Sequence, residues 1–584
     1  MKEHADALKA PITTHTQALR TQIGGPFSSL SRKSTISLLM KHGGFQILTR
    51  AGHVFTRLKK QLPNQNEEEL SQLALAMKNK AAMFFQKLCD RRYGIPSDLI
   101  SYLTFPHEGT TYTEPAAPEL ENPNLPAAFT FVGQFVDHDL TFNGLNLFDD
   151  QTGDDVTDFA SPYLDLDSMY GGRPYPDDPS DTSTKGIIKN KDVFNPDMSF
   201  KLLRLGTNAY DVPRWTNPAL PARVGAAFIY DPRNDENQLI LHIHILLMRV
   251  HNKILRQIYA ERHLDPAKPA DADQAVSLAK KEVIANWQSV LLNDYLPRIL
   301  EAETLAFVLA EIQKPGHGEL KYKPTHGKLQ MPHEFAIAFR FGHSMLRNEY
   351  RLNAFGEVPL FNNRDLERKG DLRGGRPLTK DHVIDWDIFY PENEFDASLS
   401  LKIDSKVTPV VFDLPESTIP DAIKTSGNLP FRNLTRSREI DVACGEDLAA
   451  FFGIPQSQWL TRFQVEANDQ AHYLFESDVD MYAHPGGIGE PPADDPLRGV
   501  KDTRFKTPLW YYVLKEAEVI ENGERLGPLG SRIVAEVILG GIFYGRDTKF
   551  DFGWKSQITG SNVVKLRDLI NFVNEDPPTM VEHA

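Results

Sequence analysis

The decapeptide Gly-Gln-Phe-Val-Asp-His-Asp-Leu-Thr-Phe, residues 133–142, places a histidine between two aspartates in an otherwise apolar segment. The apolar spacing around it is that of a helix with one buried face. Gln134, Asp137 and His138 are three or four residues apart, so they can point to one side of that helix, whereas Asp139 points elsewhere. Charged groups are rarely buried unless they are paired or bind a ligand. This segment therefore needs a functional explanation.

The composition is that of an ordinary globular protein. The chain has 584 residues, of which 41% are apolar and 24% are charged, and its net charge of −15 argues against nucleic-acid binding. It contains no run of about 18 apolar residues that predicts a membrane span. Residues 1–14 lack the apolar core of a signal peptide, so we expect a cytoplasmic protein or one exported without a cleavable signal. Only Cys89 and Cys444 occur, which excludes a disulfide-built fold.

Helical periodicity is common along the chain, and strand-like alternation is sparse. The clearest amphipathic pattern covers residues 236–259. Other helices are expected over 67–91 and 334–345 and around 514–519, 533–542 and 564–573, and the best strand candidate is 407–412. We predict a mainly α protein with an N-terminal helical extension over 1–95 and a catalytic domain over 96–584.

Three other segments hold candidate functional residues, and each has a plainer interpretation. Arg233 and Glu236 lie at a helix entrance, where a capping and ion-pair cluster is the commoner explanation. His343 shares a helical face with two phenylalanines, as core histidines often do, although neutral histidine is also the commonest metal ligand. The stretch 432–438 has three arginines near Asn433, which suit a surface patch or a carboxylate-binding site equally well.

Together, the order and content of these four segments resemble the animal-type haem peroxidases of the peroxidase–cyclooxygenase superfamily, and more closely its bacterial members. The resemblance covers roughly residues 100–575. It implies the fold of that family, which is mainly α, with the haem buried between helices and little β structure.

The resemblance assigns roles to residues on both sides of the haem. His138 resembles the distal histidine, the general base for hydrogen peroxide, and Arg233 and Gln134 resemble the distal arginine and glutamine. His343 resembles the proximal ligand of the haem iron. Asn433 resembles the asparagine that accepts the other ring N–H of that ligand, a contact that fixes the tautomer.

Other residues resemble those that hold the cofactor, haem b. Arg340 and Arg436 resemble the arginines near the haem propionates. Asp137 and Glu236 stand where this family can form ester bonds to haem methyl groups, so this sequence permits covalent attachment. Asn237 stands where the mammalian hypochlorite-forming enzyme has a methionine bonded to a haem vinyl group, so strong chloride oxidation is not expected.

The resemblance also implies a calcium site. An Asp-x-Asp sequence alone is usually a turn with solvated carboxylates. However, the sequence Leu-Asp-Ser-Met-Tyr-Gly at residues 166–171 matches the family, and oxygen donors from alternate loop residues suit calcium. The implied ligands are Asp139, Ser161, the Tyr163 carbonyl, Asp165 and Asp167.

The implied activity is that of a haem peroxidase, which reduces hydrogen peroxide and oxidises halides, thiocyanate or small phenolic donors through oxyferryl intermediates. The main competing hypothesis is a fatty-acid dioxygenase of the same superfamily, whose radical-forming tyrosine lies three residues before the proximal histidine. Here that position is Arg340. A non-enzymatic haem protein and, without haem, an α-helical binding protein are two further hypotheses. The intact set of His138, Arg233, His343 and Asn433 argues against the non-enzymatic haem protein, and a Soret band on purification would distinguish the haem-free binding protein.

Overall fold

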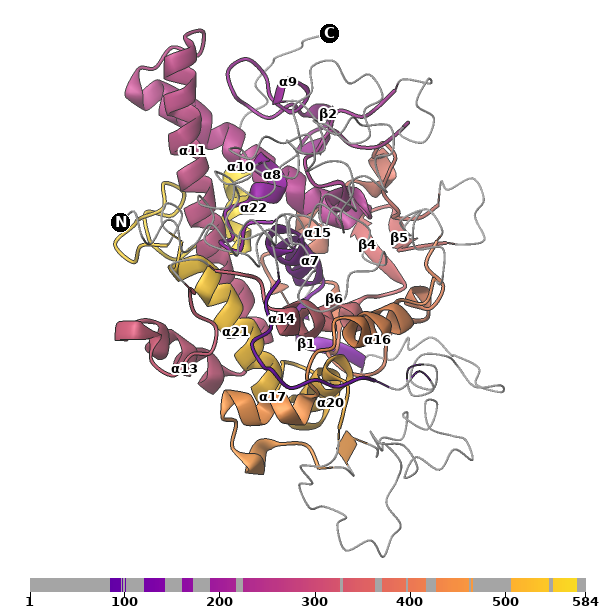
Figure 1. Ribbon diagram of the computed structural model, residues 1–584. Coiled ribbons are helices and arrows are strands. Elements are labelled where there is room, and N and C mark those ends of the chain that lie inside the picture. Colours follow the sequence, from indigo (N-terminus) through magenta and orange to yellow (C-terminus); the bar gives the residue numbers. More distant parts are fainter. Residues whose placement is uncertain are drawn as a thin grey trace, which may run out of the picture.

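The computed structural model confirms the mainly α architecture (Figure 1). It describes residues 85–95, 97, 100, 120–141, 160–171, 190–216, 224–325, 329–362, 370–394, 397–415, 427–461, 464–465, 506–545 and 550–574. Among these residues no helix combines the length and the apolar character needed to cross a lipid bilayer.

Helix α7 (Ala128–Leu140), which carries the Asp-His-Asp sequence, lies near the middle of the molecule (Figure 1). It packs against α10 (Gln238–Arg262) and the 3₁₀ helix η8 (Phe339–Met345). A Cβ atom on Gly133 would lie 2.5 Å from the hydroxyl oxygen of Tyr295. Only glycine therefore lets α7 approach that tyrosine so closely.

Helix α10 confirms the prediction over 236–259. Its N-cap residue, Asn237, accepts hydrogen bonds from the backbone N–H groups of Leu239 and Ile240 at 3.1 and 3.0 Å. The helix ends at His263, which has a left-handed backbone with a φ of 53°. It packs against α11 (Pro269–Val290) and α22 (Leu566–Asn574).

The C-terminal helices also confirm their predictions. Glu516 of α20 (Leu509–Glu521) accepts hydrogen bonds from the first N–H groups of α21 (Pro528–Phe543), at 3.0 Å from both Leu529 and Gly530. This contact joins the two helices, because a helix N-terminus has donors without intrahelical partners. Other helices are α8 (Asp167–Tyr170), α9 (Asn190–Val193), α12 (Leu296–Ile299), α13 (Ala302–Ile312), α14 (His333–Ala338), α15 (Trp386–Phe389), α16 (Leu429–Glu439) and α17 (Gly445–Phe452).

Short 3₁₀ and π segments and three two-stranded antiparallel sheets complete the described fold. The short segments are η5 (Pro232–Asp235), the π-helix η6 (Leu291–Tyr295), η7 (Pro315–His317), η9 (Lys380–His382), η11 (Pro409–Val411) and η13 (Gln456–Gln458). The sheets pair β1 (Glu121–Pro126) with β6 (Leu399–Leu401), β2 (Leu203–Gly206) with β3 (Ala209–Asp211), and β4 (Glu349–Asn353) with β5 (Gly356–Pro359).

Two predicted elements need correction. The strand over 407–412 is wrong, because the segment forms η11, where Pro409 has a fixed φ and no N–H for a sheet. The predicted helix over 334–345 is α14 followed by the 3₁₀ helix η8, so its second half is wound more tightly than expected.

The N-terminal prediction is tested only in part. Residues 85–91 of the expected helix over 67–91 are not helical, and residues 67–84 lie outside the described residues. The backbone of Gln86 pairs instead with the segment before α14, through hydrogen bonds of 2.9 Å to the Met331 carbonyl and from the His333 N–H. The division of the chain at residue 95 stays a prediction.

Candidate active site

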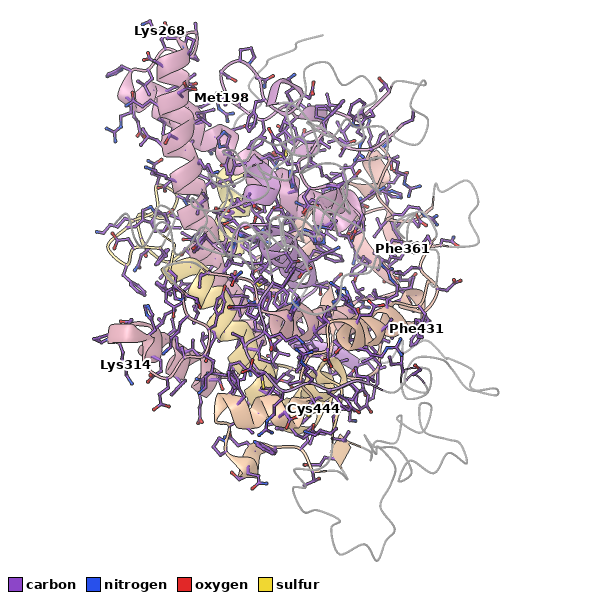
Figure 2. The ribbon with its side chains drawn as sticks, in the orientation of Figure 1. Met198, Lys268, Lys314, Phe361, Phe431 and Cys444 are labelled. Carbon is purple, nitrogen blue, oxygen red and sulfur yellow. The ribbon has the colours of Figure 1, made fainter. Side chains whose placement is uncertain are left out.

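A cavity of about 510 Å³ lies between α7, η5, η8 and α16. Every residue for which the sequence predicted a catalytic or haem-binding role lines it: Gln134, Asp137, His138, Arg233, Glu236, Arg340, His343, Asn433 and Arg436. Much of the remaining wall is apolar and includes Phe361, Leu414 and Leu429. Phe361 and Phe431 both lie on the side of the molecule occupied by β5 and α16 (Figure 2).

Two buried polar side chains, Asn234 and His244, orient His138 through a chain of hydrogen bonds. Its Nδ1 lies 2.9 Å from Asn234 Oδ1, and Asn234 Nδ2 lies 3.0 Å from His244 Nδ1. An amide oxygen accepts only, so His138 carries a proton on Nδ1, whereas its Nε2 lies 4.0 Å from Glu236 Oε2. Burial lowers the pKa of His244 to about 4, so that ring is neutral and its Nδ1 can accept.

Arg233 is held against the wall of the cavity by a carboxylate. Asp231, the N-cap of η5, accepts from Arg233 Nε at 3.1 Å and from Nη2 at 2.7 Å. Nη2 also donates to the His138 carbonyl at 3.0 Å. Neither Asp231 nor Asn234 was singled out from the sequence. Both are polar residues beside Arg233, and only their contacts in space distinguish them from the other acidic and amide residues of that segment.

Burial raises the pKa of two carboxyl groups on the same wall. Glu236 is 43% exposed because it faces the cavity, but burial by the surrounding protein still raises its pKa to about 7. Burial also raises the pKa of Asp137. Gln134 donates to Glu236 at 3.4 Å and accepts from Asn237 Nδ2 at 3.1 Å. This wall of the cavity is therefore a connected network of polar side chains.

His343 and Asn433 form a hydrogen bond on the other side of the cavity, but its direction is opposite to the one expected. Asn433 Nδ2 lies 2.8 Å from His343 Nδ1 and donates to it, whereas the resemblance predicted that Asn433 accepts the ring N–H. Asn433 Oδ1 instead accepts from Arg340 Nη1 at 3.0 Å. Burial, reinforced by Arg340 and Arg432, lowers the pKa of His343 to about 3, so its ring is neutral.

The predicted calcium ligands lie apart from this cavity, in a loop beside α7. Asp139 is fully buried, and its carboxylate accepts from the N–H groups of Leu166 and Ser168 at 3.1 and 3.3 Å. Asp167 accepts from the Ser161 N–H at 2.8 Å. Within the described part of the chain, no group of three acidic, histidine or cysteine side chains is arranged to hold a metal ion.

Sequence comparisons relate the chain to peroxidases. Residues 149–369 match the family model for animal haem peroxidase. Heme peroxidase 2 of Caenorhabditis elegans is 29% identical over 123 residues, which cover 20% of this chain and 16% of that protein. Chorion peroxidase of Aedes aegypti is 24% identical over 334 residues, which cover 54% of this chain and 39% of that protein. The chain therefore spans less than half the length of these relatives.

A solved structure shares the fold. Peroxidase A of Dictyostelium discoideum superposes with a TM-score of 0.54 at 14% sequence identity, covering 85% of this chain and 94% of that chain. At this identity the likeness concerns the fold alone, which is the mainly α fold predicted from the sequence. Residues 149–369 of the chain are therefore similar to animal haem peroxidases, and the described fold is that of a solved peroxidase.

Proposed function

We propose that this chain is a haem peroxidase that reduces hydrogen peroxide and oxidises halides, thiocyanate or small phenolic donors. The observation that carries this proposal is that one and the same cavity is lined by His138 and Arg233 on one side and by His343 on another. Peroxide cleavage needs a group that moves a proton and a cation that stabilises developing negative charge, and His138 and Arg233 provide both.

The chemistry of the cavity fits haem b. Apolar side chains such as Phe339, Leu360 and Val411 suit the faces of a porphyrin, and the guanidinium groups of Arg340 and Arg436 suit its two carboxylates. His343 is neutral, as an imidazole must be to bind a metal ion. Bound haem would supply the iron on which peroxide reacts and the oxidising equivalents passed to the donor.

Haem binding in this cavity requires the Asn433 amide to turn over. Coordination through His343 Nε2 needs the ring proton on Nδ1, and Asn433 must then present Oδ1 to it. That turn takes the acceptor away from Arg340 Nη1, which now donates to Asn433 Oδ1. Arg340 would then be released to bind a haem carboxylate, so the two changes support each other.

His138 would transfer the proton. Its Nδ1 proton is engaged by Asn234, so Nε2 has the lone pair that takes a proton from peroxide and returns it to the leaving oxygen. Arg233 would stabilise the negative charge that develops on oxygen as the O–O bond breaks. Because Asp231 orients Arg233 before peroxide arrives, little reorganisation is needed.

Ester links to the haem through Asp137 and Glu236 are part of the proposal. Both carboxyl groups line the cavity, and the raised pKa of each favours the uncharged form that can approach an apolar macrocycle. Mass spectrometry of peptides from protein treated with peroxide tests this proposal. Haem attached to the peptides that contain these residues supports it, and complete extraction of haem by acidified solvent contradicts it.

A calcium ion between α7 and the 161–167 loop is also proposed. Buried carboxylates of Asp139 and Asp167 meet this loop, and Ser161, the Tyr163 carbonyl and Asp165 would complete an oxygen set suited to calcium. Elemental analysis of the purified protein tests the proposal. One calcium per chain that is lost in Asp139→Ala and Asp167→Ala supports it.

A fatty-acid dioxygenase is the competing function to test, because one tyrosine does line the cavity. Tyr295 of η6 contacts Gly133 of α7, although Arg340 occupies the position three residues before His343. Oxygen uptake on addition of a fatty acid, abolished in Tyr295→Phe, would favour the dioxygenase.

Stopped-flow absorbance of the ferric holoprotein mixed with hydrogen peroxide tests the main proposal. We expect the Soret band to shift within the first turnover and to return when bromide, iodide or guaiacol is added. The fastest donor identifies the donor class. A haem spectrum that does not respond to peroxide would overturn the proposal.

A further inference from the structure

Four arginines line the cavity, and three of them have partners within the protein. Asp231 holds Arg233, and Arg340 donates to Asn433 and to the Ala336 carbonyl. Arg436 lies 3.9 Å from Glu439. The fourth, Arg432, is one of the three arginines of 432–438 that suited either a surface patch or a carboxylate-binding site, and its contacts differ from those of the other three.

The Arg432 side chain has no hydrogen-bond acceptor within the described residues. Its Nε is buried without a partner, and no ion pair within 4.0 Å joins the guanidinium to a described carboxylate. The Arg432 side chain is only partly buried, but its buried Nε has lost its water without gaining a partner, which is unfavourable. Its burial lowers the pKa of Arg432. Such a group is therefore suited to receive an anion that the protein itself does not provide.

Arg432 lines the cavity, and its charge acts on residues of both functional walls. It is in the second turn of α16, next to Asn433, and its charge acts on Glu236 on one side and on His343 on the other. Leu429, one helical turn earlier, also lines the cavity. A cation beside an apolar side chain suits a molecule with an aromatic body and one carboxylate.

We propose that Arg432 binds a carboxylate inside this cavity, in addition to the two for which Arg340 and Arg436 are suited. The guanidinium fork matches the two oxygens of a carboxylate. The carboxylate can belong to an organic electron donor or to the haem. Because haem has two propionates and two other arginines are available for them, the donor is the expected source. This inference rests on the proposed peroxidase function.

A matched pair of ligands and three variants test the inference on the holoprotein. The ligands are 3-(4-hydroxyphenyl)propionate and its uncharged amide, which has nearly the same shape. Arg432→Leu removes the charge, and Arg432→Lys keeps the charge without the fork. Arg438→Leu, on the same helix, is the control, since Arg438 does not line the cavity and donates to Ser97.

Three measurements separate the two sources of the carboxylate. They are the dissociation constants of both ligands for the resting ferric protein without peroxide, the KM of both as donors, and the rate of haem transfer to excess apomyoglobin. If the donor is the source, Arg432→Leu weakens binding of the acid by about 10-fold or more and binding of the amide by less than about 2-fold. Haem transfer then stays at the wild-type rate, and Arg432→Lys retains part of the preference for the acid.

If the haem is the source, Arg432→Leu accelerates haem transfer at least several-fold, and the preference for the acid over the amide does not change. If neither quantity changes relative to Arg438→Leu, the inference is overturned. Failure of the peroxidase proposal is distinguishable, because the resting protein would still bind the acid through Arg432 while showing no response to peroxide.

Discussion

His138 and Asp139 are consecutive residues of α7, yet they belong to two regions, the cavity and the 161–167 loop, whose polar groups are held by different kinds of contact. His138 lines the cavity, and its Nδ1 is engaged by the Asn234 side chain. Asp139 is fully buried on another side of the helix, where both of its oxygens accept backbone N–H groups of the 166–168 segment. In the cavity, side chains orient other side chains and leave reactive atoms accessible. In the loop, carboxylates are engaged by the backbone.

This difference shows how the loop can serve the cavity. Successive residues of a helix point about 100° apart, so a contact that fixes Asp139 also fixes the direction of His138. The loop backbone is unusual there, because Leu164 and Leu166 both have positive φ values, of 51° and 58°. We infer that the loop positions the histidine and takes no direct part in the reaction. The predictions below test this division.

The largest effect is expected for His138→Ala. Loss of the general base should slow the reaction of the ferric protein with peroxide by a factor of about 10² to 10⁴. Haem content should stay at the wild-type level, because His343 on the other wall is unchanged. Stopped-flow rates and the Soret absorbance per chain measure both quantities.

A matched control for His138→Ala is His242→Asn in α10. His242 is a buried histidine that hydrogen-bonds to the Gln238 carbonyl and the Ile384 N–H and does not line the cavity. It should alter stability without slowing the reaction with peroxide. A wild-type peroxide rate in His138→Ala would mean that another group transfers the proton.

The next largest effect is expected for Asp139→Ala, which should change the free energy of unfolding more than the rate of the reaction with peroxide. Asp139→Ala leaves the buried N–H groups of Leu166 and Ser168 without their acceptor, which should lower the free energy of unfolding by about 2 kcal/mol or more. The peroxide rate should fall by less than in His138→Ala. Denaturant unfolding and stopped-flow rates on the same samples make the comparison.

Asp139→Asn distinguishes the two ways in which this carboxylate can hold the loop. Asparagine keeps one oxygen acceptor but removes the charge that a calcium ion needs. A small loss of stability would show that the backbone contacts dominate. A loss equal to that of Asp139→Ala, together with loss of bound calcium, would show that the cation dominates.

The residues that line the cavity could be predicted from the sequence better than the residues that hydrogen-bond to them. Gln134, Asp137 and His138 share a side of α7 because helical spacing dictates it, and all three line the cavity. Asn234 could not be found this way. Its function depends on His138 and His244, which come from different parts of the chain, and no periodicity encodes a contact in space.

Orientation within a contact was also beyond the sequence. The pairing of Asn433 with His343 was expected, but the direction of the hydrogen bond depends on which acceptor Arg340 finds, and that is decided by three side chains together. Likewise, the apolar run at 407–412 suggested a strand, but the fixed φ of Pro409 and its missing N–H favoured η11. Contacts between residues far apart in the sequence compete with local propensity, and they decide such cases.

A smaller effect is expected from pH at Glu236. Burial raises its pKa from 4.5 in a model peptide to about 7, so the folded state binds this proton more tightly than the unfolded state. The stability it contributes is fully present below about pH 4.5 and is lost as pH rises through about 7. Because the side chain is 43% exposed toward the cavity, the loss should be on the order of 1 kcal/mol.

Glu236→Gln should remove this part of the pH dependence. Denaturant unfolding of the haem-free protein between about pH 4 and about pH 8, a range that brackets these two pKa values, measures the difference between wild type and variant. Equal slopes for the two proteins would show that the carboxyl group of Glu236 is solvated in the cavity and titrates normally.

The smallest effect on stability is expected for Asn237→Asp. This variant separates the two roles of the Asn237 side chain, capping α10 and donating to Gln134. Asn237 caps α10 through its oxygen and donates to Gln134 through its nitrogen. Aspartate caps a helix as well as asparagine does, so Asn237→Asp should change stability by only a few tenths of a kcal/mol, whereas Asn237→Ala should lose about 1 kcal/mol. Both variants lose the contact with Gln134, and both should therefore change the rate of iodide oxidation by the same factor, about 2- to 10-fold. If the two rates differ, the carboxylate introduced by Asn237→Asp acts on the cavity in addition to the lost contact with Gln134.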